Sequence, residues 1–372
     1  MVAGASRCPQ AIRGYDSRPV NIDLRDSWTL GNVLIPSRLV LAPMAGVSVQ
    51  AFRRQGRRYG AGLVCSEMVS VAGIQHRNER TLGYLRVGAD EHPLAIQIFG
   101  SDPVAMAEAA RMVEAAGADV VDMNFGCPVK KVTKTGAGAS LLDDPDRACR
   151  LVEAVAGATS LPVSVKTRRG VENGSRDCLT VGPRLVEAGA ASLTLHPRSA
   201  KQMYTGTADH SLTAELVSLV NVPVIASGDV TSRAKAQAVL ATTGAAAVMV
   251  GRGAQGNPWA LREIMGDDSE PSREEIVAEL ILFMRETVRE LGVERAFGFL
   301  KKFYGWYLGR GRFPKPFKQE VVLLPSVPEV EARLLEVAPG ARFVLERLLS
   351  ELPDPADEVL LDSLPISLYG GG

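Results

Sequence analysis

The feature that most constrains the fold is a regular alternation of short apolar runs and amphipathic segments between about residues 38 and 260. The apolar runs are short and rich in β-branched residues, as buried strands are, and the segments between them have helical composition. The eight expected strands are Arg38–Ala42, Gly62–Ser66, Leu94–Phe99, Asp119–Met123, Pro162–Lys166, Ala191–Leu195, Val222–Ala226 and Ala245–Val250. Eight strands with interposed helices predict an α/β fold, a (β/α)8 TIM barrel.

An open, doubly wound sheet is the alternative architecture for such an alternating chain. It fits this sequence less well because no Gly-x-Gly-x-x-Gly motif follows the first expected strand. Eight units also match the number that closes a barrel. Several expected helices end at a glycine, such as Gly117 and Gly189, which can take the left-handed turn that stops a helix.

The composition of the chain changes near residue 268. Residues 267–272 combine acids, serine and proline, which is typical of a linker and a helix cap. Helices are expected at 273–291 and 294–308, and a further one near 329–349. The expected organisation is a loose N-terminal extension (1–22), a TIM barrel (23–266), a small all-helical C-terminal domain (267–350) and a tail (351–372).

The composition argues against several classes of protein. No apolar run reaches the ~18 residues that span a bilayer, and the N-terminus has no apolar signal core, so we expect a cytoplasmic protein without a membrane partner. The 5 cysteines are scattered and have no metal-ligand spacing, so neither a disulfide framework nor a metal site is expected. The formal net charge is +0, so a polyanion would have to bind to local basic patches.

Polar residues and glycines follow seven of the eight expected strands at their carboxyl ends. In a barrel this is the face that carries the chemistry, so the pattern predicts an active site rather than an inert scaffold. The segments are Ala42–Gly46, Gln97–Gly100, Asn124–Cys127, Lys166–Arg168, His196–Arg198, Ser227–Asp229 and Gly251–Gly253. The last two are small turns whose backbone N–H groups can approach an anion, and Arg252 can add a bidentate contact, so they predict a phosphate site.

Cys127 stands out among the cysteines because Gly126 and Pro128 bar regular structure around it. A thiol with a reference pKa of about 8.5 is mostly protonated at neutral pH, which suits a proton donor. The alternative, a buried inert thiol, fits Cys65 and Cys149 better. Three lysines follow on the same loop: Lys130, Lys131 and Lys134.

Taken together, these blocks resemble the tRNA-dihydrouridine synthase family, and its bacterial branch most of all. The resemblance covers roughly residues 30–310 and holds in both order and spacing. It is carried by Ala42–Gly46, Ile96–Gly100, Asn124–Val132, Val165–Arg168, Leu195–Ser199, Ala226–Val230 and Val250–Trp259. The chain departs from the family pattern at Ser227, where many members carry Asn, and at Pro197, where Gly or Ala is common.

The resemblance implies FMN as the cofactor and NADPH (or NADH) as the electron donor. It implies that the cofactor is bound by Pro43, Met44, Ala45, Gln97, Asn124, Lys166, His196, Ser227, Gly228, Asp229, Gly251 and Arg252. Cys127 is implied as the general acid, with Arg198 and Asn124 facing the uracil or the flavin. The implied reaction transfers a hydride from reduced FMN to C6 of a uridine in tRNA, while Cys127 protonates C5.

Two rival functions make different predictions. A flavin-dependent oxidoreductase for small pyrimidines, of the dihydroorotate or dihydropyrimidine type, needs no basic helical domain. A flavin-free RNA-binding protein on an inactive barrel predicts loss of the cysteine, the lysine and the phosphate turns, all of which are present at Cys127, Lys166 and Ser227–Asp229.

Residues 301–318 are the expected RNA-binding segment of the helical domain, because they are rich in basic and aromatic residues and contain no acid. Basic groups can bind phosphates and aromatic rings can stack on bases. The alternative is a helix that packs its rings inward while its lysines reach solvent. The expected substrate contacts are Arg198, Lys130, Lys131, Lys134, Lys301, Lys302, Arg310 and Arg312.

Overall fold

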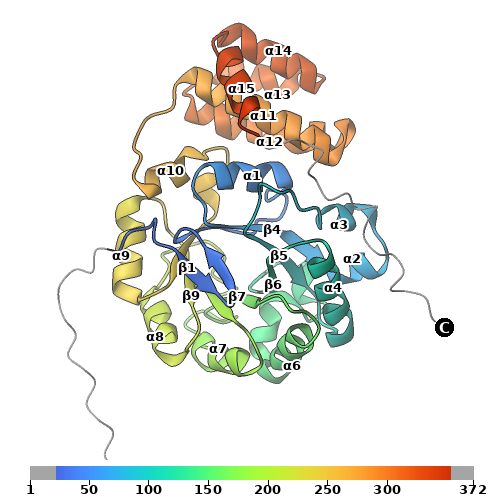
Figure 1. Ribbon diagram of the computed structural model, residues 1–372, viewed down its shortest axis with the longest axis vertical. Coiled ribbons are helices and arrows are strands. Elements are labelled where there is room, and N and C mark those ends of the chain that lie inside the picture. The colour runs from blue at the N-terminus through green and yellow to red at the C-terminus, as the bar shows by residue number, and fades with distance from the viewer. Residues whose placement is uncertain (1–21, 353–372) are drawn as a thin grey trace, which may run out of the picture.

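The computed structural model describes residues 22–352 as a barrel followed by a set of helices (Figure 1). The N-terminal extension and the tail expected from the sequence lie almost wholly outside the described residues. Among those residues, no helix is long and apolar enough to cross a membrane.

Eight parallel strands close the barrel, so the predicted fold is confirmed. The strands are β3 (Leu39–Leu41), β4 (Leu63–Ser70), β5 (Leu94–Phe99), β6 (Val120–Phe125), β7 (Val163–Arg168), β8 (Ser192–His196), β9 (Val224–Ser227) and β10 (Ala247–Val250). They pair in chain order, and β10 pairs with β3 to complete the ring. Their side chains are nearly all buried, as expected for parallel strands that are covered on both faces.

β4 is longer than the sequence predicted. It runs to Ser70, and its register against β5 shifts between Cys65 and Met68. Such an irregularity bends a strand and re-aims its side chains. Here it lies next to Glu67, whose carboxylate accepts a hydrogen bond from the backbone of Gly46 at 2.7 Å. The irregular strand therefore supports the loop that follows β3.

Helices surround the barrel, and a small hairpin packs against it. The helices of the barrel region are α1 (Gln50–Arg58), α2 (Val71–Gln75), α3 (Glu79–Gly83), α4 (Pro103–Ala115), α5 (Lys130–Thr133), α6 (Pro145–Ala156), α7 (Cys178–Glu187), α8 (Ser211–Leu219), α9 (Arg233–Thr243) and α10 (Trp259–Met265). Several begin at caps that the sequence signals, such as Asp102 for α4 and Ser232 for α9. The hairpin of β1 (Trp28–Leu30) and β2 (Val33–Ile35) was not predicted, because its runs of three residues are too short to show a period.

The C-terminal region contains five helices. They are α11 (Arg273–Leu291), α12 (Val293–Arg310), α13 (Lys315–Leu323), α14 (Val327–Val337) and α15 (Ala341–Ser350). Ser272 and Glu275 form a capping box at the start of α11. The single helix predicted near 329–349 is wrong: it is two helices, α14 and α15, separated at Pro339 and Gly340, because proline cannot continue a helical hydrogen-bond ladder.

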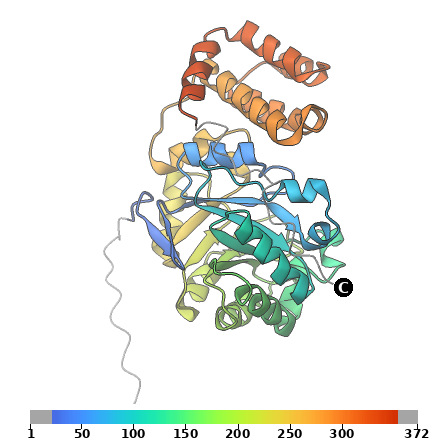
Figure 2. The ribbon, with the colours of Figure 1, turned by 45° about the vertical axis from the view of Figure 1, so that its right-hand side comes forward.

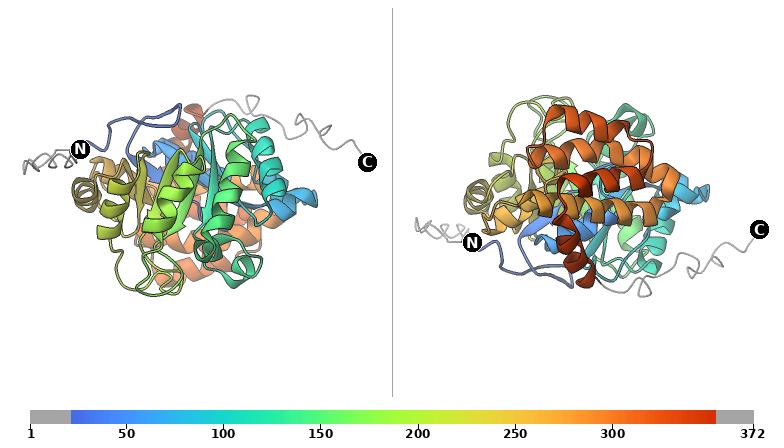
Figure 3. Two further views of the ribbon diagram at one scale, coloured as in Figure 1. Left: turned by 90° about the horizontal axis from the view of Figure 1, so that it is seen from below. Right: turned by 90° about the horizontal axis from the view of Figure 1, so that it is seen from above.

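The helical region rests on α1 and α10 of the barrel (Figure 2; Figure 3, right). Buried polar groups line this contact. The carboxylate of Glu279 on α11 accepts hydrogen bonds from Gln55, at 2.8 Å, and from Arg58. Tyr307 of α12 donates to the Gln55 side chain at 2.7 Å, and its ring lies edge-on to Trp259. These directional bonds fix how the two parts sit against each other.

The two buried tyrosines of α12 offer a matched test of this contact. Tyr307→Phe removes the hydroxyl that donates to Gln55, and we expect a loss of about 1–2 kcal/mol in the free energy of unfolding because a buried acceptor loses its partner. Tyr304→Phe is the control, because the Tyr304 hydroxyl is buried and has no hydrogen-bond partner within residues 22–352. Its removal should leave stability unchanged or slightly raised. Urea unfolding of both variants measures the difference, and equal losses would contradict the assignment.

Candidate active site at the carboxyl ends of the strands

A chain of buried amides links the barrel interior to the loop that carries Cys127. The Asp122 carboxylate accepts a hydrogen bond from the Gln97 amide nitrogen at 2.5 Å. The Gln97 carbonyl accepts one from the Asn124 amide nitrogen at 2.8 Å. The Asn124 carbonyl in turn accepts bonds from the backbone N–H groups of Cys127, at 2.8 Å, and Gly126, at 3.1 Å. β5 and β6 are neighbours in the barrel, so the sequence folds these distant residues into one line.

The Cys127 loop is held in place by its own backbone. The Cys127 carbonyl accepts a hydrogen bond from the backbone N–H of Ala139 at 3.0 Å. Gly138 has a φ of 64°, and an added Cβ would lie 2.7 Å from that carbonyl, so only glycine fits there. The thiol itself is half-buried. The neighbouring helix α5 and the residue after it carry Lys130, Lys131 and Lys134, all exposed.

Positive charge gathers around His196 at the end of β8. Burial, together with repulsion from the nearby Lys166, Arg168, Arg198 and Arg252, lowers the pKa of His196 to about 2. Burial also lowers the pKa of Lys166 to about 8, with Arg168 contributing to the decrease. Clustered cations that depress one another's protonation favour a bound anion, since an anion would relieve their repulsion.

Two residues assigned to ligand binding are instead bonded to each other. Arg198 is buried and holds both carboxylate oxygens of Asp229 at 2.8 Å, and it also donates to the backbone carbonyl of Gly206 at 2.6 Å. Asp229 accepts a further bond from the backbone of Ala208. Arg198 and Asp229 thus fix the loops after β8 and β9, and their contacts to the base and to the cofactor stay predictions.

The glycines in the turns after β9 and β10, which were predicted to cradle a phosphate, have close neighbours. Gly228 has a φ of 118°, and a Cβ there would lie 2.9 Å from the His196 ring. Its carbonyl contacts His210 Nε2 at 2.9 Å. Gly251 lies beside Ala42 and Met44, while the Arg252 side chain is exposed. A larger residue at Gly228 would clash with His196, so the turn requires glycine.

Gly228→Ala should weaken cofactor binding about tenfold, because the new methyl group meets His196 and forces a left-handed backbone that costs about 1–3 kcal/mol. Gly117→Ala is the matched control. Gly117 is also left-handed, with a φ of 86°, but nothing lies within 4 Å of an added Cβ. This control should lose stability without losing cofactor affinity. Fluorescence titration with FMN, together with thermal unfolding, separates the two effects, and equal FMN affinity in both variants would contradict the cradle.

Residues that had no sequence-based assignment also reach the site. Arg168 ties the end of β7 to the loops after β6 and β8 by donating to the backbone carbonyls of Gly126 at 2.9 Å, Ser199 at 2.9 Å and Met203 at 2.8 Å. Tyr204 is 51% exposed, with the Arg252 guanidinium 4.4 Å from its ring centre. Its ring also lies 6.2 Å from that of His196. An isolated tyrosine in a polar loop gave no sequence signal, whereas Arg168 could have been found as the end of the Lys166–Arg168 block.

The loop after β3 forms another part of the rim. Pro43 and Met44 are partly exposed and Ala45 is exposed. The backbone of Met44 donates to the Ser48 hydroxyl at 2.9 Å, which gives the loop a tight turn. Lys302 of α12 donates to the backbone carbonyl of Gly46. The helical region therefore touches the loop that was predicted to line the cofactor ring.

The basic and aromatic segment 301–318 packs inward to a large extent. Phe303, Tyr304 and Tyr307 are fully buried, so these rings are not available for stacking on bases. Arg310 forms ion pairs with Glu263 at 2.8 Å and Glu270 at 3.0 Å.

Arg310 is held by these acids, and the ammonium group of the exposed Lys302 binds the Gly46 carbonyl, while RNA contacts of both residues stay predictions. Arg312 is exposed, and Lys301 is partly exposed, with its ammonium group 4.6 Å from the Phe297 ring.

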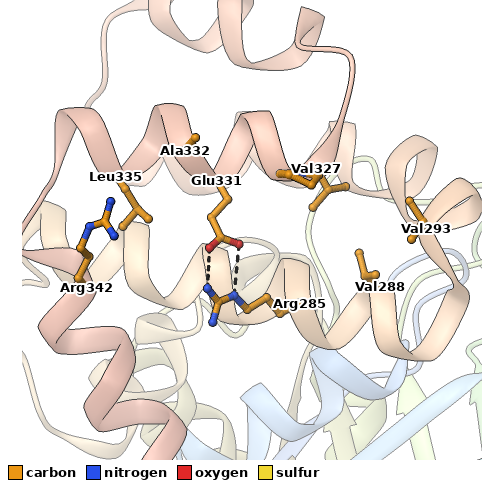
Figure 4. A pocket seen from close by; sticks show the side chains of 9 residues that line it. Arg285, Val288, Val293, Val327, Glu331, Ala332, Leu335 and Arg342 are labelled. Carbon is orange, nitrogen blue, oxygen red and sulfur yellow. Dashed lines mark hydrogen bonds and ion pairs between the residues drawn. The ribbon is translucent and has the colours of Figure 1, made fainter.

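A cavity of about 500 Å³ lies in the helical region, away from the strand ends. Figure 4 shows it between α11 and α14, crossed by the ion pair of Arg285 and Glu331 at 2.6 Å. Valines line one end and Arg342 the other (Figure 4). It holds none of the predicted site residues, so the chemistry of the strand ends, rather than the shape of this cavity, locates the candidate site.

Residues 40–329 match the family model described as dihydrouridine synthase. The chain belongs to the dihydrouridine synthase family. It is 40% identical over 293 residues to tRNA-dihydrouridine synthase B of Pseudomonas aeruginosa, covering 75% of this chain and 86% of that protein. It is 36% identical to the Pasteurella multocida protein of the same name, covering 82% of this chain and 94% of that one.

Solved structures resemble the barrel of this chain. An old yellow enzyme homologue from Zymomonas mobilis superposes with a TM-score of 0.52 at 14% identity, covering 67% of this chain and 94% of that chain. Morphinone reductase gives a TM-score of 0.50 at 15% identity, covering 66% and 90%. At this identity the likeness shows the fold alone. Family membership confirms the expectation of an oxidoreductase, and no group of acidic, histidine or cysteine side chains within residues 22–352 could hold a metal ion.

Proposed function

We propose that this protein reduces the C5–C6 double bond of uridine in tRNA, with FMN as cofactor and NADPH or NADH as electron donor. The observation that carries the proposal is the position of Cys127, whose loop is anchored by Asn124 and whose thiol lies near the cationic Lys166 at the end of β7. Relatives named tRNA-dihydrouridine synthase B match most of the chain.

The strand ends fit an anionic flavin phosphate. Gln97 and Lys166 would contact the pyrimidine edge of the ring, where a cation stabilises the reduced form. The turns at Ser227, Gly228 and Gly251, with Arg252, would hold the phosphate. Burial and the repulsion from neighbouring cations together lower the pKa of His196 and Lys166, and this crowding of positive charge supports the assignment. The bound flavin supplies the hydride. The side chains of this protein supply orientation, charge and the proton.

Cys127 would donate the proton that C5 of the uracil requires. Its thiol is half-buried at the rim, on a loop fixed by Asn124 and Gly138. A positioned general acid accelerates such a transfer without forming a covalent bond to the base. Tyr204, which is exposed beside Arg252 and His196, would offer the base an aromatic surface.

The uridine must leave its stack in the folded tRNA to reach the pocket, which costs a few kcal/mol and requires contacts to the RNA backbone. We assign these contacts to cations that reach the surface. They are the exposed Lys130, Lys131 and Lys134 next to Cys127, and the partly exposed Lys301 and exposed Arg312 on the helical region. A cleft of about 640 Å³ lined by Arg77, Arg80 and Arg295 adds a second basic surface, to which the barrel and α12 both contribute.

Reoxidation of the reduced flavoprotein tests the proposed function. The purified protein should be yellow, and NADPH should bleach it in the absence of air. Unmodified tRNA should then restore the colour, while free uracil and orotate should not. Reoxidation by the small pyrimidines and not by tRNA would instead indicate an enzyme of small-molecule metabolism.

Salt dependence tests the RNA contacts. We expect the triple variant Lys130→Ala, Lys131→Ala, Lys134→Ala to weaken tRNA binding and to reduce the slope of log K against log salt by about 0.7–0.9 for each phosphate that is no longer neutralised. The matched control replaces three exposed cations on the outer helices, Arg111, Arg150 and Lys235, and should keep the wild-type slope. Filter binding between 50 and 200 mM salt measures both, at a salt range where such slopes are evident. Equal slopes in the two triple variants would place the RNA elsewhere.

A further inference from the structure

The buried carboxylate of Asp122 has no part in the function proposed above. It lies on β6 in the barrel interior and is 3% exposed. Ser164 donates to one of its oxygens and Gln97 to the other. Burying an ionisable group is costly, so a carboxylate in a barrel core calls for a reason beyond packing. Burial raises the pKa of Asp122 to about 6, against hydrogen bonds from Ser164 and Gln97 that lower it.

The direction of the hydrogen bonds shows what the carboxylate does. An ionised carboxylate can only accept, so the Gln97 amide nitrogen must face Asp122 and its carbonyl must face Asn124. Asn124 then has to donate to Gln97, which turns its own carbonyl toward the N–H groups of Gly126 and Cys127. The Asp122 carboxylate at one end of this hydrogen-bond series and the backbone N–H groups at the other end require the same arrangement. The Gln97 and Asn124 amides between them therefore each have one orientation.

We propose that Asp122 is a positioning residue that orients the Gln97 and Asn124 amides and thereby fixes the backbone of the Cys127 loop. The proposal deepens the proposed function, on which it rests for the roles of Gln97 and Cys127. Gln97 keeps a second N–H free for the pyrimidine edge only while its nitrogen points to the Asp122 side. Cys127 keeps its place only while the Asn124 carbonyl accepts its N–H.

Replacement of Asp122 by a residue of similar size that cannot accept a hydrogen bond tests the proposal. In Asp122→Leu, the Gln97 nitrogen loses its partner and the amide chain loses its fixed end. We expect exchange of the Gly126 and Cys127 backbone amides to rise roughly three- to tenfold, and FMN affinity to fall by a similar factor, as for the loss of one hydrogen bond. Hydrogen exchange on the full-length protein and FMN titration measure these effects without any turnover.

Two further variants separate positioning from general stability. Asp122→Asn keeps an oxygen acceptor toward Gln97 and should restore both measurements to within about threefold of the wild type. Ser164→Ala removes the other hydrogen bond to the carboxylate and should leave amide exchange at Gly126 and Cys127 unchanged. Unchanged exchange in Asp122→Leu, or the same rise in all three variants, would overturn the proposal.

A variant at Gln97, the next residue in the hydrogen-bond series, tests the proposal if Asp122→Leu does not fold. Gln97→Met retains the carboxylate and cuts the link to Asn124, so the exchange of the Gly126 and Cys127 amides should rise in the same way. Unchanged exchange would again overturn the proposal. Failure of tRNA to reoxidise the flavin, with these exchange results intact, would remove the proposed function alone and leave the positioning chain standing.

Discussion

Cys127→Ala is expected to reduce dihydrouridine formation by about 10²–10⁴-fold, the contribution of a positioned general acid. The variant should still bind FMN and should still be reduced by NADPH at the wild-type rate. The reason is that the thiol lies on the rim, whereas the proposed flavin contacts at Gln97 and Lys166 lie on the strands beneath it. Single-turnover mixing of the reduced protein with tRNA isolates the step that should fail.

Cys149→Ala is the matched control for this prediction. Cys149 is also a half-buried thiol, but it lies on α6, where its sulfur contacts the Arg184 backbone carbonyl at 3.6 Å. Its removal should leave both half-reactions unchanged. Near-normal turnover in Cys127→Ala would remove the general-acid role, while slow flavin reduction in the same variant would show that the loop also shapes the nicotinamide site.

The barrel could be predicted from the sequence because its signals are local. Each strand is a short apolar run, and each active-site group follows a strand end, so topology alone brings Gln97, Asn124, Lys166 and His196 to one face. Parallel pairing in chain order then makes neighbours of residues that are 27 positions apart, as Gln97 and Asn124 are. The family blocks added the identity of the groups.

The partners of each polar group could not be predicted in the same way. Arg198 and Arg310 resemble ligand-binding arginines in sequence, but each finds an acid far along the chain, Asp229 or Glu263. Asp122 reads as one residue of an apolar strand, and only the β5–β6 register shows that it meets Gln97. Pairing choices of this kind depend on tertiary distances, which no spacing rule encodes.

The burial of the aromatic residues of α12 could not be predicted from the sequence either. Their clustering with lysines suits either RNA stacking or a core with a charged rim. The structure selects the core, because Phe303 and Tyr307 pack against Phe283 of α11 with ring centres 4.6 and 5.9 Å away. The helix thus serves first to attach the helical region to the barrel, and Lys302 extends that attachment to the loop at Gly46.

Lys166→Met is expected to slow flavin reduction by about 10²–10³-fold, as the loss of one preorganised group that stabilises developing charge does. Methionine has a similar length and shape but no charge. Stopped-flow reduction of the FMN-loaded variant by NADPH measures the effect, and Lys235→Ala on α9 serves as the remote control. A wild-type reduction rate in Lys166→Met would show that the reduced ring is stabilised by other groups.

The same substitution should make the cofactor-free protein more stable, which separates function from folding. Burial lowers the pKa of Lys166 to about 8, against about 10.4 in an unfolded chain, so the folded state disfavours the charged form. The unfolded chain therefore binds more protons between these two pKa values. The free-energy cost of burying the charged Lys166 destabilises the folded protein fully below about pH 8 and fades as the pH rises toward about 10.4.

Methionine removes this cost, so at pH 7 the variant without FMN should unfold at a higher temperature than the wild type. With reduced FMN bound the order should reverse, because only the lysine gains an anionic partner, the negatively charged edge of the reduced ring. A variant that is less stable in both states would mean that Lys166 supports the barrel itself, and its slow reduction could then not be assigned to lost charge at the flavin.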